Sequence, residues 1–138
     1  MKSIIEAENE IIEEFELFDD WMDKYNYIIE LGKSLPLIDP QYKDDAHLIP
    51  GCQSQVWLHA EFNDGRLIFR ADSDAIITKG IINLLIRVLS GHTPQEIADC
   101  PLDYIDKIGI KEHLSPTRSN GLLSMIQQIK GYAANALK

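Results

Sequence analysis

One cysteine of the chain stands in a setting that suits chemistry, in the stretch GCQSQ at positions 51–55. Pro50 and Gly51 come directly before the thiol of Cys52, so we expect it at the junction of a loop and a strand. Its following neighbours are polar, and loop positions present side chains to partners more readily than positions inside an element. The sequence therefore predicts that Cys52 is a reactive residue.

A nucleophilic thiol must be ionised. The pKa of an unperturbed cysteine is about 8.5, so little thiolate exists at neutral pH unless a cation or a helix N-terminus lies nearby. The side chains that can supply this help are His47, His59, Lys79 and Arg118. Their spacing along the chain does not say which of them approaches Cys52.

Three other interpretations of the cysteines are open from the residues alone. A free cysteine beside an apolar strand is often a small buried hydrophobe. A cysteine hydrolase needs a histidine base, for which His47 or His113 is available, but no protease signature surrounds Cys52. A zinc site needs ligands at a characteristic spacing, and we expect none, because no CxxC or HxxxH pair occurs among the candidates Cys52, Cys100, His47, His59, His92 and His113.

The composition limits the class of protein. The 138 residues suit one domain, spanning 1–138, with 45% hydrophobic and 25% charged residues. Thirteen basic against 22 acidic residues give a net charge of −9, which disfavours nucleic acid as a partner. The longest apolar run, 76–89, is interrupted by Lys79, Asn83 and Arg87, so we expect no membrane span. The acidic N-terminus is unlike a secretory signal, and two cysteines suit a reduced, cytoplasmic protein.

The first half of the chain predicts two helices and a loop. Apolar residues recur at helical spacing over 3–18, opposite an acidic face. Asp19 or Asp20 can cap a second helix over 21–35, which Pro36 limits. Three prolines make 36–51 a loop.

The middle of the chain predicts a hairpin. Apolar and polar residues alternate over 55–62, and a partner strand over 66–72 follows the turn Asn63-Asp64-Gly65. A short strand near 47–49 is expected to be the third of about three strands.

The remaining sequence predicts helices. Ser73 or Asp74 can cap a helix over 75–89, and Thr93-Pro94-Gln95-Glu96 is a capping box that opens a short helix. Another short helix is expected over 103–108, and Ser115-Pro116 opens the last one. The chain is therefore expected to be an α+β protein with a small antiparallel sheet flanked by helices.

Four blocks of the sequence, in this order and spacing, resemble the SufE family of sulfur-acceptor proteins. They are KYNYIIELG (24–32), GCQSQVW (51–57), DSDAIITKG (72–80) and HLSPTRSNGL (113–122). The acidic first helix and the region 84–111 match that family only in pattern, and the loop 33–49 diverges from it.

The resemblance implies a function and partners. SufE proteins take sulfane sulfur from a pyridoxal-phosphate cysteine desulfurase (SufS-like), stimulate it, and pass the sulfur to a SufB-containing scaffold for iron-sulfur clusters. The implied fold is shared with NifU-type scaffolds, with the cysteine tucked against an apolar cavity. No cofactor is implied for this chain itself, and it is not expected to be a stand-alone enzyme. Monomer and homodimer both fit.

The resemblance also assigns residues. Cys52 is the implied sulfur acceptor, and Arg118 is expected to dock the partner or stabilise an anionic sulfur. Asp74 is expected to cap a helix, to anchor the cysteine loop, or both. The remaining supporting residues expected around the thiol are Gly51, Gln53, Ser54 and Gln55. Two other functions compete: a docking module whose thiol is incidental, and a cysteine-dependent hydrolase.

Overall fold

A computed structural model describes residues 2–138, and its sheet is a single antiparallel hairpin of β1 (Val56–Asn63) and β2 (Arg66–Ser73). The register pairs Val56 with Ser73 and Asn63 with Arg66. The two residues of the turn, Asp64 and Gly65, have φ angles of 54° and 80°. Such turns match the right-handed twist of the strands, which is why Asp-Gly favours this hairpin. The predicted hairpin and its turn are confirmed.

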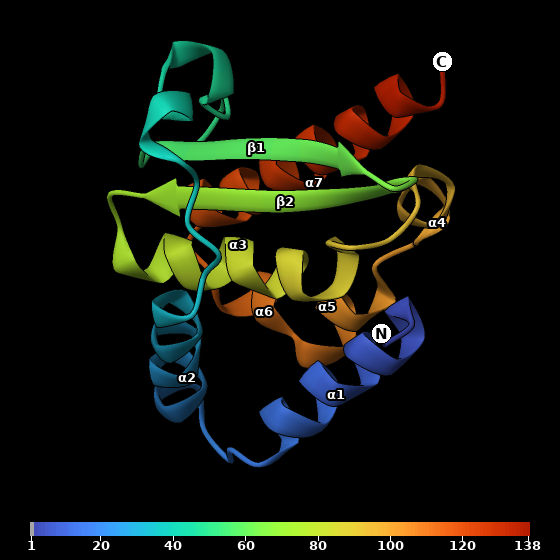
Figure 1. Cartoon of the computed structure of the whole chain (residues 1–138). Coiled ribbons are helices and arrows are strands. Elements are labelled where there is room, and N and C mark those ends of the chain that lie inside the picture. The colour runs from blue at the N-terminus through green and yellow to red at the C-terminus, as the bar shows by residue number, and fades with distance from the viewer. Residues whose placement is uncertain (1) are drawn as a thin grey trace.

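Helices lie below and behind this hairpin (Figure 1). β1 and β2 lie above α3, α7 passes behind the strands, and α1, α2, α5 and α6 lie below α3. In chain order the helices are α1 (Ile4–Glu16), α2 (Trp21–Lys33), the 3-10 helices η1 (Pro40–Tyr42) and η2 (Asp45–His47), α3 (Ile76–Leu89), α4 (Pro94–Asp99), α5 (Asp103–Ile108), α6 (Ile110–His113) and α7 (Pro116–Ala136). The expected α+β class is confirmed.

α3 forms the centre of the hydrophobic core. Most of its residues are buried, because the hairpin covers one side of the helix and α2 covers another. α2 and α3 touch at their backbones: a Cβ atom added to Gly80 would lie 1.9 Å from the carbonyl oxygen of Ile28. The buried amide of Asn83 donates to the carbonyl oxygen of Leu31 at 2.7 Å. These contacts make α2 a fixed neighbour of the elements that α3 supports.

The edge of β2 is covered by chain segments that are not strands. The amide of Ala71 donates to the carbonyl oxygen of Pro36, and the amide of Leu67 donates to that of His92. An uncovered strand edge exposes unpaired backbone groups, so these segments stabilise a sheet of only two strands.

The third strand expected near 47–49 is wrong. Asp44 caps η2 and accepts a hydrogen bond from the amide of His47, so the backbone turns there instead of extending. What remains is one isolated bridge between Leu48 and Trp57. Pro50 follows and has no N–H to donate, so pairing with β1 ends.

Other details also differ from the expectation. The second helix ends at Lys33, two residues early, and the helix α6 was not predicted. The helix α3 is capped by Ala75 without a side-chain bond, so the predicted caps Ser73 and Asp74 are wrong. The carboxylate of Asp74 instead accepts a hydrogen bond from the amide of Gln55. The hydroxyl of Ser73 donates to the carbonyl oxygen of Gln55 and accepts from the amide of Ala75, not from an amide inside the helix.

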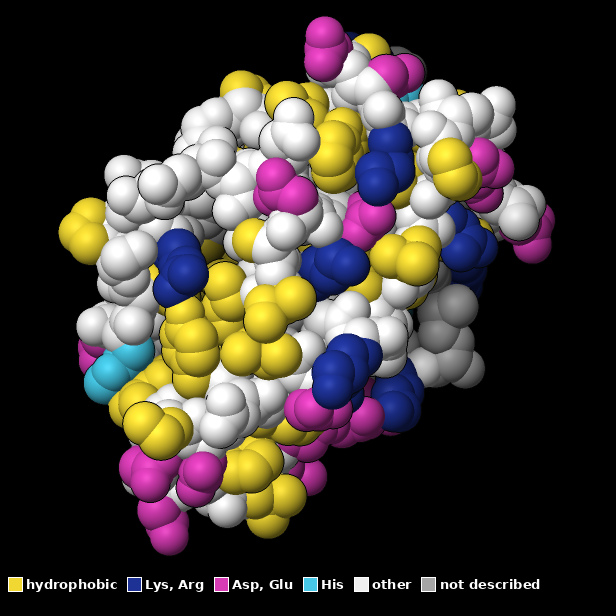
Figure 2. Space-filling model, turned by 90° about the vertical axis from the view of Figure 1, so that its left-hand side faces the viewer, with side chains coloured by type: hydrophobic (Ala, Val, Ile, Leu, Met, Phe, Trp, Pro, Cys, Tyr) yellow, Lys and Arg dark blue, Asp and Glu magenta, His cyan; other side chains and the backbone are white. Residues whose placement is uncertain are grey.

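Among residues 2–138 no helix is both long and apolar enough to span a membrane. The face on which α2 and the first turns of α3 lie carries a group of hydrophobic side chains with Lys and Arg side chains beside it (Figure 2). Met22 of α2 and Ile76 of α3 are exposed hydrophobic residues of these two elements.

Candidate functional site

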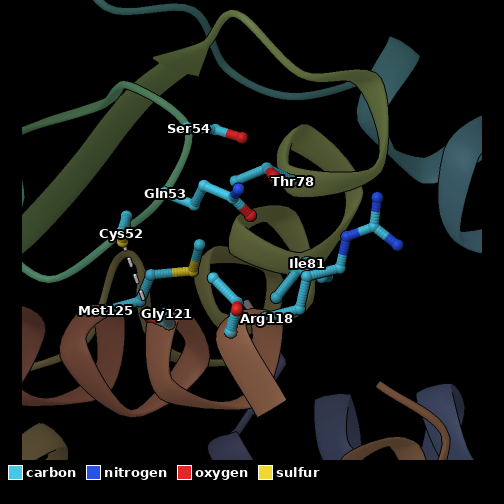
Figure 3. Close-up of a pocket in the computed structure, with 9 residues that line it drawn as sticks. Cys52, Gln53, Ser54, Thr78, Ile81, Arg118, Gly121 and Met125 are labelled. Carbon is cyan, nitrogen blue, oxygen red and sulfur yellow. Dashed lines mark hydrogen bonds between the residues drawn. The ribbon is translucent and has the colours of Figure 1, made fainter. Parts of the chain in front are cut away.

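Cys52 lies in the loop that joins η2 to β1 and faces the first turns of α7 (Figure 3). Its side chain is partly buried, and its thiol donates a weak hydrogen bond to the carbonyl oxygen of Gly121, with the two atoms 3.7 Å apart. A Cβ atom on Gly121 would lie 3.6 Å from the sulfur. The helix therefore approaches the thiol through a residue without a side chain.

The residue before the thiol is a glycine for two physical reasons. Gly51 has a φ angle of 85°, in the left-handed region that other residues rarely adopt. A Cβ atom at this position would also lie 2.6 Å from the hydroxyl oxygen of Ser124 in α7. Both the turn and the close approach of the loop to α7 require a glycine here.

The cysteine loop is anchored at its C-terminal end. The carboxylate of Asp74 accepts a hydrogen bond from the backbone amide of Gln55 at 3.1 Å, and the hydroxyl of Ser73 donates one to the carbonyl oxygen of Gln55 at 2.8 Å. Within the described chain, the backbone groups of residues 51–54 make no hydrogen bond beyond the turn at Pro50 and Gly51. On the other side of the thiol the amide of Ile49 donates to the carbonyl oxygen of Val56 at 2.8 Å, so the segment is tied at both ends. Few backbone hydrogen bonds hold its middle, residues 51–54, against opening.

A cavity of about 70 Å³ opens beside the sulfur. It is bounded by the cysteine loop, by α3 and by the N-terminal turns of α7 (Figure 3). The lining residues are Cys52, Gln53, Ser54, Thr78, Ile81, Thr117, Arg118, Gly121 and Met125. A space of this size can hold one additional sulfur atom next to the thiol.

In the arrangement observed, the cavity disfavours the ionised form of Cys52. Burial raises the pKa of the Cys52 thiol above its usual value. Of the nine described lining residues Arg118 alone is charged, and its guanidinium points away from Cys52 (Figure 3). The guanidinium instead donates a hydrogen bond to the hydroxyl of Tyr25 in α2. The resting thiol is therefore protonated and shielded.

The structure brings most of the predicted site residues together. Gly51, Gln53 and Ser54 accompany Cys52 in the loop, with Gln53 and Ser54 lining the cavity. Gln55 is the residue through which Asp74 holds the loop, so of the two structural roles expected for Asp74 the anchor is the one observed. Arg118 lines the cavity through its side-chain stem.

The other candidate helpers of the thiol lie elsewhere. The ring of His59 stacks on Tyr42 at 3.9 Å, and His47 packs against both rings on the outer face of β1. His113 stacks on Trp21. Because none of the described histidines lines the Cys52 cavity, the hydrolase interpretation has no base there.

The last side chain that was a candidate to lower the pKa of Cys52, Lys79, and the second cysteine, Cys100, also lie outside the cavity lining. Lys79 lies 3.5 Å from a carboxylate oxygen of Asp72, outside the cavity lining. Cys100 ends α4 and is buried. In residues 2–138 no group of three or more His, Cys, Asp or Glu side chains is arranged to hold a metal ion.

Sequence reasoning did not select five residues of the cavity: Thr78, Ile81, Thr117, Gly121 and Met125. Met125 stands at helical spacing with other apolar residues of the last helix, which signals only that this side chain faces inward. Nothing in the local pattern indicates that α3 and α7 meet at the cysteine loop.

Comparison with known proteins gives one family. The family model described as "SufE: Fe-S metabolism associated domain" matches residues 9–133. The chain is 42% identical over 134 residues to an uncharacterised SufE-like protein of Rhizobium meliloti (strain 1021), covering 94% of this chain and 96% of that protein. It is 40% identical over 127 residues to an uncharacterised SufE-like protein of Rhizobium etli, covering 88% and 86%.

A longer plant relative and a solved structure add to this. The chain is 38% identical over 119 residues to SufE-like protein 1, chloroplastic/mitochondrial, of Arabidopsis thaliana, covering 86% of this chain but only 32% of that protein. The solution structure of a hypothetical protein from Thermus thermophilus superposes with a TM-score of 0.78 at 20% identity, covering 95% and 96% of the two chains. That structure shows the same fold.

Proposed function

The chain belongs to the SufE family, which is associated with Fe-S metabolism, and from this premise we propose that it is a sulfur acceptor. In this proposal Cys52 receives sulfane sulfur from the persulfide of a cysteine desulfurase. Removal of that sulfur frees the cysteine of the desulfurase for another turnover and so stimulates the enzyme. The protein then relays the sulfur to an iron-sulfur scaffold. The placement of a single partly buried thiol at a small cavity, on a loop whose residues 51–54 have few backbone hydrogen bonds, carries the proposal.

The transfer is a thiol exchange in which atoms and electrons balance. The thiolate of Cys52 attacks the terminal sulfur of the donor persulfide, and a new S–S bond forms on Cys52. The S–S bond of the donor breaks, and the donor cysteine leaves as a thiolate. No external oxidant or reductant is needed. A single acceptor thiol suits this step, because a neighbouring cysteine would close a disulfide and release the sulfur.

The loop supports both halves of such a relay. In the closed arrangement the cavity shields a sulfur atom on Cys52 from reductants and oxidants. In an open arrangement residues 51–54 leave α7 and present the thiol to the partner, which costs little backbone hydrogen bonding. The raised pKa of Cys52 fits a resting state that stays unreactive until the loop opens.

The partners and setting belong to the same proposal. The donor is a SufS-like desulfurase that brings its own pyridoxal phosphate, and the final acceptor is a SufB-containing scaffold. We propose the cytoplasm as the compartment, because two free cysteines suit a reducing environment. The proposed domain spans residues 1–138, of which Met1 lies outside the described residues. A homodimer is compatible with the relay.

Mass spectrometry tests the proposal. The purified protein is incubated with a SufS-like desulfurase, pyridoxal phosphate and free cysteine, and the Cys52 peptide is analysed without reductant. We expect a mass gain of one or more sulfur atoms on that peptide, none in Cys52→Ser, and an unchanged gain in Cys100→Ser.

The same experiment separates the competing functions. If the wild-type Cys52 peptide gains no sulfur from an active donor, the acceptor role is wrong. If Cys52→Ser still stimulates the desulfurase fully, the chain is a docking module with an incidental thiol. A hydrolase would turn over its substrate with no partner protein present.

A further inference from the structure

The one charged side chain of the cavity lining among the described residues is held outside the cavity by a neighbouring helix. Arg118 lies in the first turn of α7, and its guanidinium donates to the hydroxyl of Tyr25 in α2. The same guanidinium carbon lies 5.9 Å from the centre of the Tyr25 ring, at the outer limit of a cation–π contact. In Figure 3 the guanidinium extends to the side opposite Cys52.

We propose that Tyr25 is a positioning residue that holds the guanidinium of Arg118 away from Cys52. When this contact is released, the guanidinium turns into the cavity and stabilises an anionic sulfur there. The inference deepens the sulfur-acceptor function and rests on it for its biological meaning. The coupling between the two side chains can be measured on the isolated protein.

Arg118 needs only a side-chain rotation to reach the sulfur. Its backbone is fixed, because its amide donates to the capping hydroxyl of Ser115 at 3.2 Å. Arg118 stands one helical turn before Gly121, whose carbonyl oxygen accepts a hydrogen bond from the thiol of Cys52. The stem of Arg118 already lines the cavity, so a change of rotamer moves the charge from α2 toward Cys52.

Tyr25 can keep Arg118 in one position because the helix that carries Tyr25, α2, is itself held in place by its neighbours. α2 packs on α3 with backbone contact at Gly80, and one turn before Tyr25 the ring of Trp21 stacks on His113 at 3.9 Å. The hydroxyl of Tyr25 is therefore presented at a constant position to the start of α7. The contact is on the surface, where a single hydrogen bond to an exposed arginine is weak. A developing negative charge on Cys52 can compete with it.

Electrostatics favour the released state once the sulfur is charged. The other lining side chains described here carry no charge, so nothing in the cavity compensates a thiolate or a persulfide anion. Burial, which raises the pKa of Cys52, also strengthens the attraction of a cation that enters. A thiol beside an arginine ionises at lower pH than one without.

Alkylation of Cys52 as a function of pH tests the proposal on the purified protein. In a Cys100→Ser background, the rate with iodoacetamide is measured from pH 6 to 10 for four forms: Tyr25 intact, Tyr25→Phe, Arg118→Gln and the double variant. Tyr25→Phe keeps the ring and removes the hydroxyl that accepts from Arg118. We expect its profile to move to lower pH, with roughly three- to tenfold faster alkylation at pH 7.

The expected pattern across the variants is specific. Arg118→Gln alone should leave the pH profile of alkylation near that of the parent, because in the parent the guanidinium is held by Tyr25 and does not reach Cys52. In the double variant, Arg118→Gln should abolish the shift that Tyr25→Phe causes. Tyr27→Phe is the matched control: it removes a hydroxyl from the same helix, one that donates to Glu14 far from the cavity, and leaves the profile unchanged.

Three outcomes overturn the proposal: an unshifted profile in Tyr25→Phe, a shift that persists in the double variant, or an equal shift in Tyr27→Phe. Near-ultraviolet circular dichroism confirms that each variant is folded. Because no desulfurase is present, the result is independent of the sulfur-transfer test. A protein that shows the shift but accepts no sulfur refutes the proposed function and leaves the coupling of Tyr25 to Arg118 intact.

Discussion

The sulfur of Cys52 lies 3.7 Å from the carbonyl oxygen of Gly121, across 69 residues of sequence. This contact joins a loop without regular structure to the longest helix of the described chain, and it defines where the thiol rests. The loop reaches this position because Gly51 lacks a side chain: a Cβ atom there would lie 2.6 Å from the hydroxyl oxygen of Ser124 in the helix.

Gly121→Ala should separate stability from reactivity. Alanine stabilises a helix by up to about 1 kcal/mol relative to glycine, and its Cβ atom would lie at ordinary contact distance, 3.6 Å, from the sulfur. We expect a higher free energy of unfolding together with slower alkylation of Cys52, because the added methyl group narrows the access to the sulfur. Guanidinium titration and iodoacetamide kinetics measure the two effects.

Gly131→Ala is the control for that variant. Gly131 lies in the same helix with open space around the added Cβ atom, so it should give a similar gain in stability with unchanged alkylation of Cys52. Equal alkylation rates in both variants would show that Gly121 does not limit access to the thiol.

Gly51→Ala should disturb the cysteine loop more than a strained turn alone would. The variant incurs the cost of a positive φ angle, about 1 kcal/mol or more, and a clash at 2.6 Å with the Ser124 hydroxyl. Gly65→Ala has a similar φ angle, 80°, but no neighbour within 4 Å of its Cβ atom. We expect Gly51→Ala alone to increase hydrogen exchange over residues 51–55; similar exchange there in both variants would argue against the close approach.

Asp74→Ala should loosen the C-terminal end of the cysteine loop. It removes the acceptor of the Gln55 amide, an exposed hydrogen bond whose loss should cost less than about 1 kcal/mol. We expect faster hydrogen exchange at residues 51–55 and faster alkylation of Cys52. Asp74→Asn keeps a carbonyl oxygen at the same place and should retain most of the protection. An unchanged exchange rate in Asp74→Ala would mean that the bonds of the Ser73 hydroxyl and of the backbone amide of residue 74 to Gln55 hold the loop.

The reactivity and stability of the protein should both depend on the ionisation of Cys52. Burial raises the pKa of this thiol in the folded chain, so alkylation of the folded protein should have a higher midpoint pH than alkylation of the urea-unfolded chain, about 8.5. The folded state then holds a proton that the unfolded state releases. The resulting stabilisation is full below pH of about 8.5 and is lost as the pH rises through the folded pKa.

Comparison with Cys52→Ser isolates this contribution. Between pH 7 and pH 10 the free energy of unfolding should fall more for the wild type than for Cys52→Ser, which lacks the titrating thiol. Cys100, whose pKa burial also raises, is present in both proteins and cancels in the comparison. Parallel stability curves would contradict the raised pKa.

Local patterns predicted most of the elements because each depends on neighbouring residues. The Asp64-Gly65 turn permits two positive φ angles, and alternation over the flanking residues sets the register of the hairpin. The capping box at Thr93 opens α4 as predicted. The third strand failed because Asp44 offers its side chain to the backbone of His47 and so competes with strand pairing.

By itself the sequence determined the α+β class, the helices and hairpin, the SufE family and the choice of Cys52 as the candidate acceptor. These follow from side-chain periodicity, turn chemistry and the spacing of short motifs. Only the tertiary structure decided that the thiol rests on Gly121, that Asp74 holds Gln55, and that the charge of Arg118 is turned toward Tyr25, 93 residues away. Contacts over such separations arise from how α2, α3 and α7 pack around one core, and no local preference of the chain encodes that packing.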